Sequence, residues 1–123
     1  MLKLSSDNLK AYTIELWNDQ GDRLILGYNQ DNKRYFIDRA KAGQSDFNRE
    51  FAKIAYAPRF TTGPSTDLKL VIDASSIELF ADGGLTVMTG LFFPTHPYNY
   101  LLIKSTEGMV IGKAQLMPLK SVW

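Results

Sequence analysis

The chain has 123 residues, a net charge of +1 from 14 basic and 13 acidic residues, and no cysteine. This length is typical of one domain, and 45% hydrophobic with 22% charged residues is typical of a folded protein. The absence of cysteine excludes disulfide scaffolds and thiolate metal sites, and His96 is the single histidine. Balanced charge without a run of like charges argues against nucleic acid or an anionic membrane as partner. We expect neither a metal nor a cofactor.

The start of the chain does not have the character of a targeting segment. Residues 1–10 are polar apart from separated leucines, which does not fit a signal peptide. The apolar stretches fall far short of the ~20 residues that a membrane helix needs. Any secretion signal of a parent protein is therefore expected outside this sequence.

Alternation of apolar and polar residues with a period of two dominates the chain and predicts β-strands. A clear case is the segment in which Leu68, Leu70 and Ile72 share one face. Residues that favour strands, mainly Val, Ile, Thr, Tyr and Phe, fill these segments. In chain order, the predicted strands cover residues 11–17, 23–29, 34–38, 68–72, 76–81, 85–93, 98–105 and 109–119.

Clusters of Gly, Asn and Asp at residues 18–22, 30–33, 82–84 and 106–108 separate these strands. Gly and Asn tolerate the positive φ that tight hairpin turns require. Residues 47–57 fit either a short helix or a strand that ends at Pro58, and we favour the strand. Roughly nine short strands without a long helix predict an all-β fold. We expect a two-sheet antiparallel β-sandwich of jelly-roll or concanavalin-like type, in one domain over residues 1–123.

Two blocks of residues, in this order, carry a resemblance to a known family. In the first, Gly27-Tyr28-Asn29 is followed by Tyr35-Phe36-Ile37-Asp38-Arg39. In the second, a strand ends at Asp73, and Ser76-Ile77-Glu78-Leu79-Phe80, a turn at Gly83 and Phe93-Pro94 follow. From about Ala11 to its last residue, the chain resembles the C-terminal domain of glycoside hydrolase family 32, which includes invertases, inulinases and levanases.

The resemblance implies a module that is not an enzyme by itself. In the family, a five-bladed β-propeller carries the active site, and a β-sandwich follows it. The propeller uses two carboxyl groups in a retaining mechanism, within the motifs Trp-Met-Asn-Asp-Pro-Asn-Gly, Arg-Asp-Pro and Glu-Cys. None of the three occurs here. Trp17-Asn18-Asp19-Gln20-Gly21 is superficially similar to the first motif but lacks its Met and Pro, so we predict a β-turn there.

The expected partner is therefore the catalytic propeller of a parent enzyme, which is absent from this chain. The absence of cysteine fits a bacterial protein, and the resemblance implies a parent enzyme that cleaves levan, inulin or sucrose. It also implies a secreted or periplasmic parent, with the cytoplasm left open. The sandwich would pack on the propeller and stabilise it, and the isolated module would self-associate through the same surface.

The residues of the two blocks are interpreted as structural. Glu78 fits either a catalytic or sugar-binding carboxylate or a structural acid, and we favour a buried acid paired with Arg39. An unpaired buried charge would cost several kcal/mol. Asp73 is expected to fix the turn after its strand, since a metal site needs several convergent oxygens. The motif residues in question are Asp38, Arg39, Asp73, Ser76, Glu78, Phe80 and Gly83.

Aromatic side chains are the candidates for sugar stacking, because sugars present apolar C–H faces. Most aromatic residues of a sandwich belong to its core, however. Trp17 is out of phase with Ile14 and Leu16, which makes it the best candidate for an outward ring, and Tyr98 is a further one. The wider set is Tyr12, Trp17, Tyr98, Tyr100 and Trp123.

Three functions stay open on the sequence. The first is a structural module on a catalytic propeller. The second is a carbohydrate-binding module that holds fructan, and the third is a free-standing adhesion or inhibitor domain. Sandwich folds host all three, so the fold alone does not choose between them.

Overall fold

The computed structural model describes residues 1–41, 54–73, 76–91, 98, 100–105, 107–109 and 111–116. These residues form strands and turns without a helix, so no described helix is available to cross a membrane. His96, Trp123, Phe93 and Pro94 lie outside the described residues, as do residues 47–53. The strands are β1 Leu2–Ser6, β2 Tyr12–Trp17, β3 Arg23–Asn29, β4 Arg34–Lys41, β5 Ile54–Pro58, β6 Thr66–Ile72, β7 Ser76–Ala81, β8 Thr86–Leu91, β9 Tyr100–Lys104 and β10 Lys113–Leu116.

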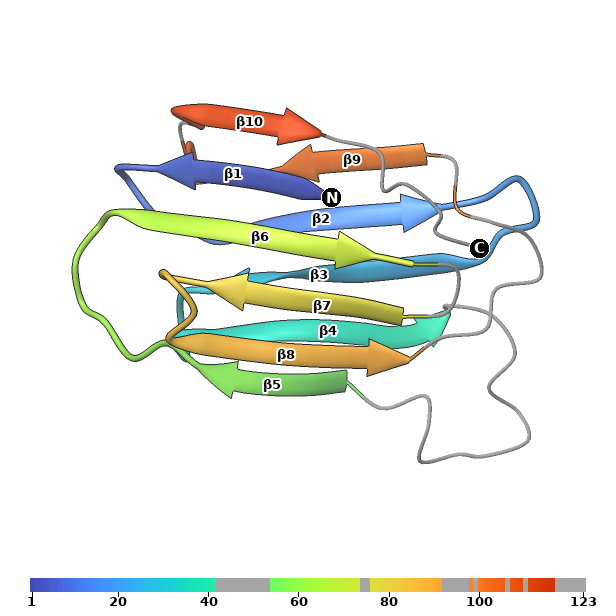
Figure 1. The fold of residues 1–123 in the computed structure, drawn as a ribbon, viewed down its shortest axis with the longest axis horizontal. Helices are drawn as coiled ribbons and strands as arrows, with labels where there is room; N and C mark the ends of the chain where they lie inside the picture. The colour runs from blue at the N-terminus through green and yellow to red at the C-terminus, as the bar shows by residue number, and fades with distance from the viewer. Residues whose placement is uncertain are drawn as a thin grey trace.

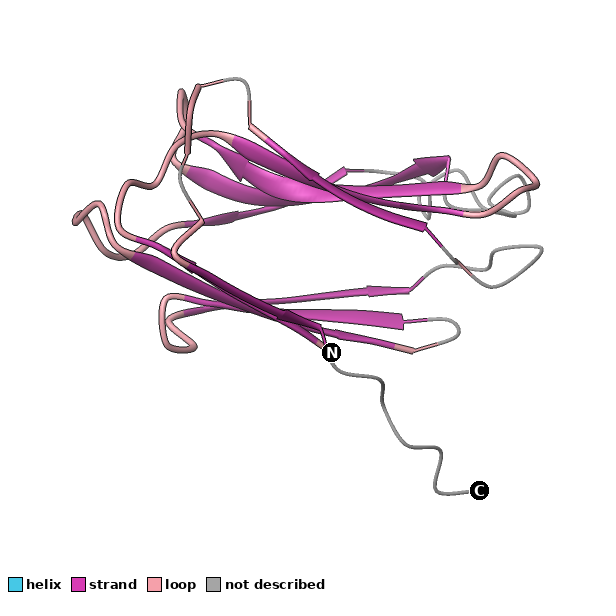
Figure 2. Ribbon diagram, turned by 90° about the horizontal axis from the view of Figure 1, so that it is seen from above, coloured by secondary structure: helices cyan, strands magenta, loops and turns pink. Residues whose placement is uncertain are grey.

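The strands form two five-stranded antiparallel sheets that face each other as two layers (Figures 1 and 2). The first, sheet A, has the order β10-β1-β6-β7-β8, and the second, sheet B, has the order β5-β4-β3-β2-β9. Sheet A lies in front in Figure 1, and β5 and β8 lie together at the lower edge. The predicted all-β two-sheet sandwich is confirmed.

The core lies between the inner faces of the two sheets, where the alternation predicted from the sequence places the apolar side chains. In β6, Leu68 and Leu70 are buried while Lys69 is exposed, and in β7 the same holds for Ile77 and Leu79 around Glu78. A side chain that leaves water contributes about 1.5–3 kcal/mol when fully buried. The largest fully buried apolar side chains are Tyr35, Ile14, Leu24, Leu26, Ile37, Leu68, Leu70, Ile77 and Leu79.

Most predicted strands agree with the structure to within a few residues, and the strand option for 54–58 is confirmed. One strand was not predicted. Leu2 and Leu4 belong to β1, are 3% exposed, and lie in the interior of sheet A between β6 and β10. The described residues therefore hold ten strands rather than roughly nine. Leu2 and Leu4 are two residues apart, which is the period-two pattern of a strand. The same spacing is the reason why this segment does not fit a signal peptide.

Gly27 marks a place where two strands leave no room for a side chain. In β3 it lies opposite Thr13 of β2 and Phe36 of β4. A Cβ built on Gly27 would collide with the carbonyl oxygen of Tyr12. Because that oxygen belongs to backbone, neither strand can yield without disturbing the ladder of hydrogen bonds.

We expect Gly27→Ala to lower the free energy of unfolding by about 1–3 kcal/mol, the usual cost of overpacking. The measurement is urea denaturation followed by circular dichroism. Gly63→Ala is the matched control, since nothing lies within 4 Å of an added Cβ there, and it should change stability by less than about 0.5 kcal/mol. Equal stability of the two variants would contradict the close approach at Gly27.

Candidate functional site

The motif residues of the second block follow one hairpin of sheet A. The Asp73 N–H donates to the carbonyl of Ser76 at 2.8 Å and closes the connection between β6 and β7. Phe80 lies on the outer face of β7, with the Lys69 ammonium 5.7 Å from its ring centroid. Gly83 has φ +68°, so the predicted tight turn requires its freedom from a Cβ.

The predicted buried pair of Glu78 and Arg39 is wrong. Glu78 is exposed, because Ile77 and Leu79 on either side take the core positions of β7. Arg39 is half-buried on the inner face of β4, where its Cδ would lie 3.7 Å from a Cβ at Gly90. The two side chains therefore lie on opposite faces of sheet A.

The motif residues do not converge on one site. By the alternation of β4, Asp38 lies on the outer face of sheet B, whereas Glu78 lies on the outer face of sheet A. Ser76 is half-buried and Asp73 is exposed at the end of the sandwich. A structural role for these residues stays a prediction. Within the described residues, no three His, Asp or Glu side chains gather in a way that would hold a metal ion.

A buried polar network that was not predicted lies at the opposite end of the sandwich. The Arg59 Nε lies 3.2 Å from Asp82 Oδ2, and the two side chains are 5% and 3% exposed. Tyr35 donates its hydroxyl to Asp82 Oδ2 at 2.7 Å, and Thr66 donates to Oδ1 at 2.8 Å. Arg59 and Tyr35 come from the sheet B side, and Thr66 and Asp82 from sheet A. The network therefore joins the two layers.

Burial and the charges of this network shift the pKa values of Tyr35 and Arg59. Burial raises the pKa of Tyr35, and the Asp82 carboxylate adds to the rise. Burial lowers the pKa of Arg59, but the hydrogen bond and charge of Asp82 outweigh it, so the pKa of Arg59 is raised overall. Arg59 also donates to the carbonyls of Gly63 at 2.7 Å and Ser65 at 2.8 Å. Each of the three guanidinium nitrogens of Arg59 therefore donates a hydrogen bond within the fold.

No local pattern in the sequence joins these four side chains. Asp82 precedes two glycines and was interpreted as a turn residue, and it does adopt φ +55°. Arg59 follows a proline after the last residue of β5. A charged residue directly after an uncharged strand is the one signal that would have pointed to Arg59.

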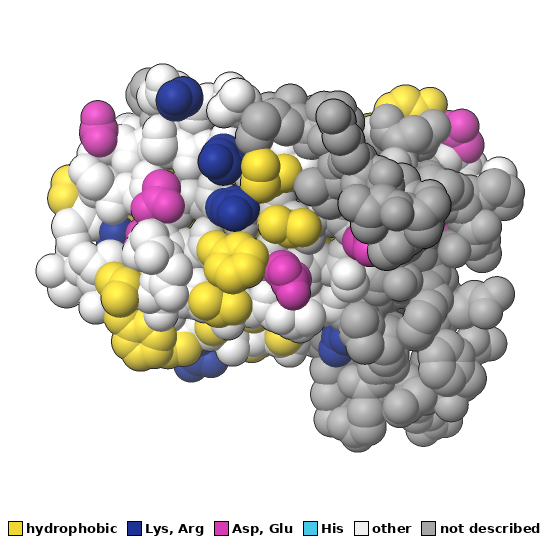
Figure 3. All heavy atoms as spheres, viewed as in Figure 1, with side chains coloured by type: hydrophobic (Ala, Val, Ile, Leu, Met, Phe, Trp, Pro, Cys, Tyr) yellow, Lys and Arg dark blue, Asp and Glu magenta, His cyan; other side chains and the backbone are white. Residues whose placement is uncertain are grey.

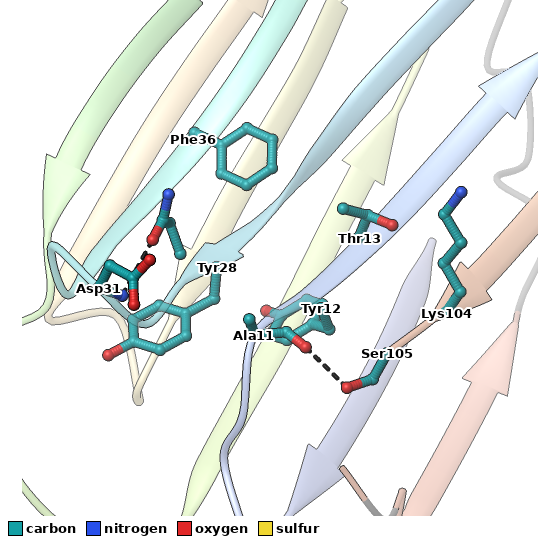
Figure 4. A pocket seen from close by; sticks show the side chains of 9 residues that line it. Ala11, Tyr12, Thr13, Tyr28, Asp31, Phe36, Lys104 and Ser105 are labelled. Carbon is teal, nitrogen blue, oxygen red and sulfur yellow. Dashed lines mark hydrogen bonds between the residues drawn. The ribbon is translucent and has the colours of Figure 1, made fainter. Parts of the chain in front are cut away.

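A groove of about 360 Å³ on the outer face of sheet B is a candidate binding site (Figure 4). Thr13, Phe36 and Lys104 are among the side chains that line it. Ser105 donates to the Ala11 carbonyl at 2.7 Å and holds the loop at its rim. Asp31 is the carboxylate among its described lining residues, so the groove does not offer the carboxyl pair of a retaining glycosidase.

The aromatic residues considered for sugar stacking lie in different environments. Trp17 lies outward and half-buried, as predicted, and stacks on Tyr100. Tyr12 is 2% exposed and belongs to the core. Tyr98 is half-buried against the core, and burial raises its pKa. Sugar binding by Trp17 or Tyr98 stays a prediction, and the position of Tyr98 does not favour it.

We expect Asp82→Asn to lower the free energy of unfolding by about 3 kcal/mol, because it leaves the Arg59 charge buried without a counter-charge. Asparagine also tolerates positive φ, so the turn itself is kept. Thermal and urea denaturation measure the change. Glu78→Ala is the control and should change stability by less than about 0.5 kcal/mol, as is usual at an exposed position. A larger loss in Glu78→Ala than in Asp82→Asn would contradict the assignment.

Comparison with known proteins places this arrangement in a family. The model described as Glycosyl hydrolases family 32 C terminal matches residues 1–120. Levanase of Bacillus subtilis (strain 168) is 29% identical over 98% of this chain and 18% of its own length. Levanase of Bacillus sp. (strain L7) is 27% identical over 91% of this chain and 12% of its length.

The solved structures agree with the sequence matches. The crystal structure of exo-inulinase from Aspergillus awamori superposes with a TM-score of 0.75 and 25% identity, over 92% of this chain and 23% of that one. The present chain thus spans less than a quarter of each of these relatives. Because the family match extends over nearly every residue and the fold agrees, the chain belongs to the C-terminal domain family of glycoside hydrolase family 32.

Proposed function

We propose that this chain is a non-catalytic module that docks on the catalytic propeller of a glycoside hydrolase and stabilises it. The docking surface is the edge of the sandwich made by β5 and β8, called here the β5–β8 edge. The relatives are much longer than this chain, which supports a partner domain of the same enzyme. The absence of charged residues from strands β5 and β8 themselves is the observation that carries the proposal.

The four outermost strands of the described sheets differ in charge. Exposed strand edges invite pairing with other chains, and soluble proteins usually protect them with charged side chains, above all lysine. Strand β9 contains Lys104, and β10 contains Lys113. Strand β5 reads Ile-Ala-Tyr-Ala-Pro and β8 reads Thr-Val-Met-Thr-Gly-Leu, without a charge in either. An edge without such protection is expected to be covered by a partner.

A hydrogen bond ties the two strands of the β5–β8 edge together. Thr86 donates its hydroxyl to the carbonyl of Pro58 at 2.9 Å, which ties β8 to the last residue of β5. Figure 3 shows hydrophobic side chains gathered at the lower left, over β7, β8 and the turn between them. An exposed apolar patch of this kind marks an interface. The exposed large side chains on or beside the two strands are Phe60 at 67%, Leu85 at 58%, Val87 at 54%, Tyr56 at 49% and Ile54 at 43%. By the alternation of burial, Val87 faces outward from sheet A, whereas Ile54 and Tyr56 face outward from sheet B.

The absence of catalysis by the chain alone is the second part of the proposal. Retaining glycosidases need two carboxyl groups about 5–5.5 Å apart. Asp82 is committed to Arg59, Tyr35 and Thr66, and Glu15 lies 3.4 Å from the Lys104 ammonium. These acids serve structural contacts, which supports a catalytic centre in the partner domain.

Carbohydrate binding is a second candidate function, and one observation favours it. Trp17 in β2 and Tyr100 in β9 form a stacked aromatic pair near the edge of sheet B that lies opposite β5. Because β9 and β5 form opposite edges of sheet B, binding of fructan at β9 and docking on the propeller at β5 are compatible.

We expect the module to raise the melting temperature of its separately expressed catalytic domain. At a hundredfold excess over Kd, mass action stabilises that domain by about 2.7 kcal/mol. Val87→Lys should abolish the rise, because it places a charge in the apolar edge. Thermal shift measurements detect both effects.

The matched control is Leu102→Lys, which adds the same charge at a similarly exposed leucine of the opposite edge strand. It should leave the rise intact. In sedimentation, the isolated wild-type module should self-associate and Val87→Lys should remain monomeric. A full rise in melting temperature with Val87→Lys would refute docking through this edge.

The chain alone should release no reducing sugar from sucrose, levan or inulin. The assay uses purified protein, with Glu78→Gln as a test for contaminating activity. Equal background in both proteins agrees with the proposal. Turnover by the wild type that Glu78→Gln abolishes would make Glu78 catalytic and overturn the non-catalytic assignment.

A further inference from the structure

Two aromatic rings form a platform on the outer face of sheet B. Trp17 in β2 and Tyr100 in β9 lie directly opposite each other in the antiparallel register. Their ring centroids are 5.3 Å apart, and the ring planes differ by 18°. Offset stacking of this kind fixes the orientation of both rings at little further entropic cost. The pair is therefore preorganised before any ligand arrives.

The turn beside this pair is held rigidly by one side chain. Asn18 is 3% exposed, and its Oδ1 accepts from the N–H groups of Gln20 at 3.0 Å and Asp22 at 3.1 Å. Its Nδ2 donates to the Asp22 carboxylate at 3.1 Å. Asp19 is carried by this turn, two residues after Trp17, and hydrogen bonding and charge from its carboxylate raise the pKa of Tyr100. The turn thus places a carboxylate at the rim of the aromatic pair.

One face of the Tyr100 ring is open to a ligand. Trp17 covers the other face, and β9 is the outermost strand of sheet B among the described residues. The Tyr100 side chain accordingly stays 43% exposed. Asp19 is exposed as well, and a carboxylate offers about four lone-pair positions to hydroxyl donors.

We propose that the open face of Tyr100, together with Asp19, binds one ring of a neutral saccharide chain. The apolar C–H face of the sugar stacks on the Tyr100 ring, and its hydroxyls donate to the Asp19 carboxylate. The negative charge of Asp19 selects against acidic polysaccharides. This inference rests on the second candidate function above and names its site.

The test is affinity electrophoresis of the purified chain in gels that contain levan, inulin or polygalacturonate. The variants are Tyr100→Ala, Tyr100→Phe and Asp19→Ala. The matched control is Ile111→Ala, which removes a large side chain that is 37% exposed and belongs to neither proposed surface. Melting temperatures of all variants establish that each protein is folded. Asp19 is an exposed turn residue, so Asp19→Ala keeps the test valid if Tyr100→Ala does not fold.

Levan or inulin should retard the wild type and Ile111→Ala equally, while polygalacturonate should retard neither. Tyr100→Ala and Asp19→Ala should bind about tenfold more weakly, a change of 1.4 kcal/mol. Tyr100→Phe keeps the ring and should bind within about threefold of the wild type.

Retardation of folded Tyr100→Ala or Asp19→Ala equal to that of the wild type would overturn the site and leave fructan binding standing. A wild type that neither levan nor inulin retards would overturn fructan binding itself. Stronger retardation in polygalacturonate than in the neutral polymers would refute the proposed selection by charge.

Discussion

The structure depends on burying one carboxyl group, that of Asp82, among hydrogen-bond donors and beside a guanidinium. A buried charge is tolerated only when donors surround it and a counter-charge lies beside it. Arg59, Tyr35 and Thr66 meet that requirement from three other segments. The donors come from both layers, so satisfying the charge also sets how the sheets lie at this end. The same guanidinium orders the loop before β6 through Gly63 and Ser65.

The sequence predicted those features of the fold that depend on short-range patterns of residues. Alternation placed Leu68, Leu70, Ile77 and Leu79 on inner faces, and turn residues such as Gly83 placed the hairpins. It failed where a partner is distant in sequence. The Arg59–Asp82 pair joins residues of different sheets, and nothing around either residue indicates the other. The same limit explains the wrong pairing of Glu78 with Arg39. Each residue belongs to a block that resembles the family, but this does not show that their side chains are close in space.

The two sides of the sandwich follow different physical constraints. Lysines on β9 and β10 keep those edges in water, and the uncharged β5 and β8 leave theirs suited to a covering surface. On the proposed assignment, the module is attached to its enzyme along one edge and presents Tyr100 and Asp19 from the other. A polymer held there would remain close to the catalytic domain, and its effective concentration would rise without any change in the active site.

The position of β1 has a consequence for how the module is made. Its residue Leu2 pairs with Leu70 in β6 and with Leu116 in β10, near the middle and the far end of the chain. During synthesis β1 emerges before the other strands of this module, whereas its two neighbours emerge later. Pairings so distant along the chain close slowly, because the loop entropy is lost before the contacts form. The described part of sheet A is therefore complete only when almost the whole module is available.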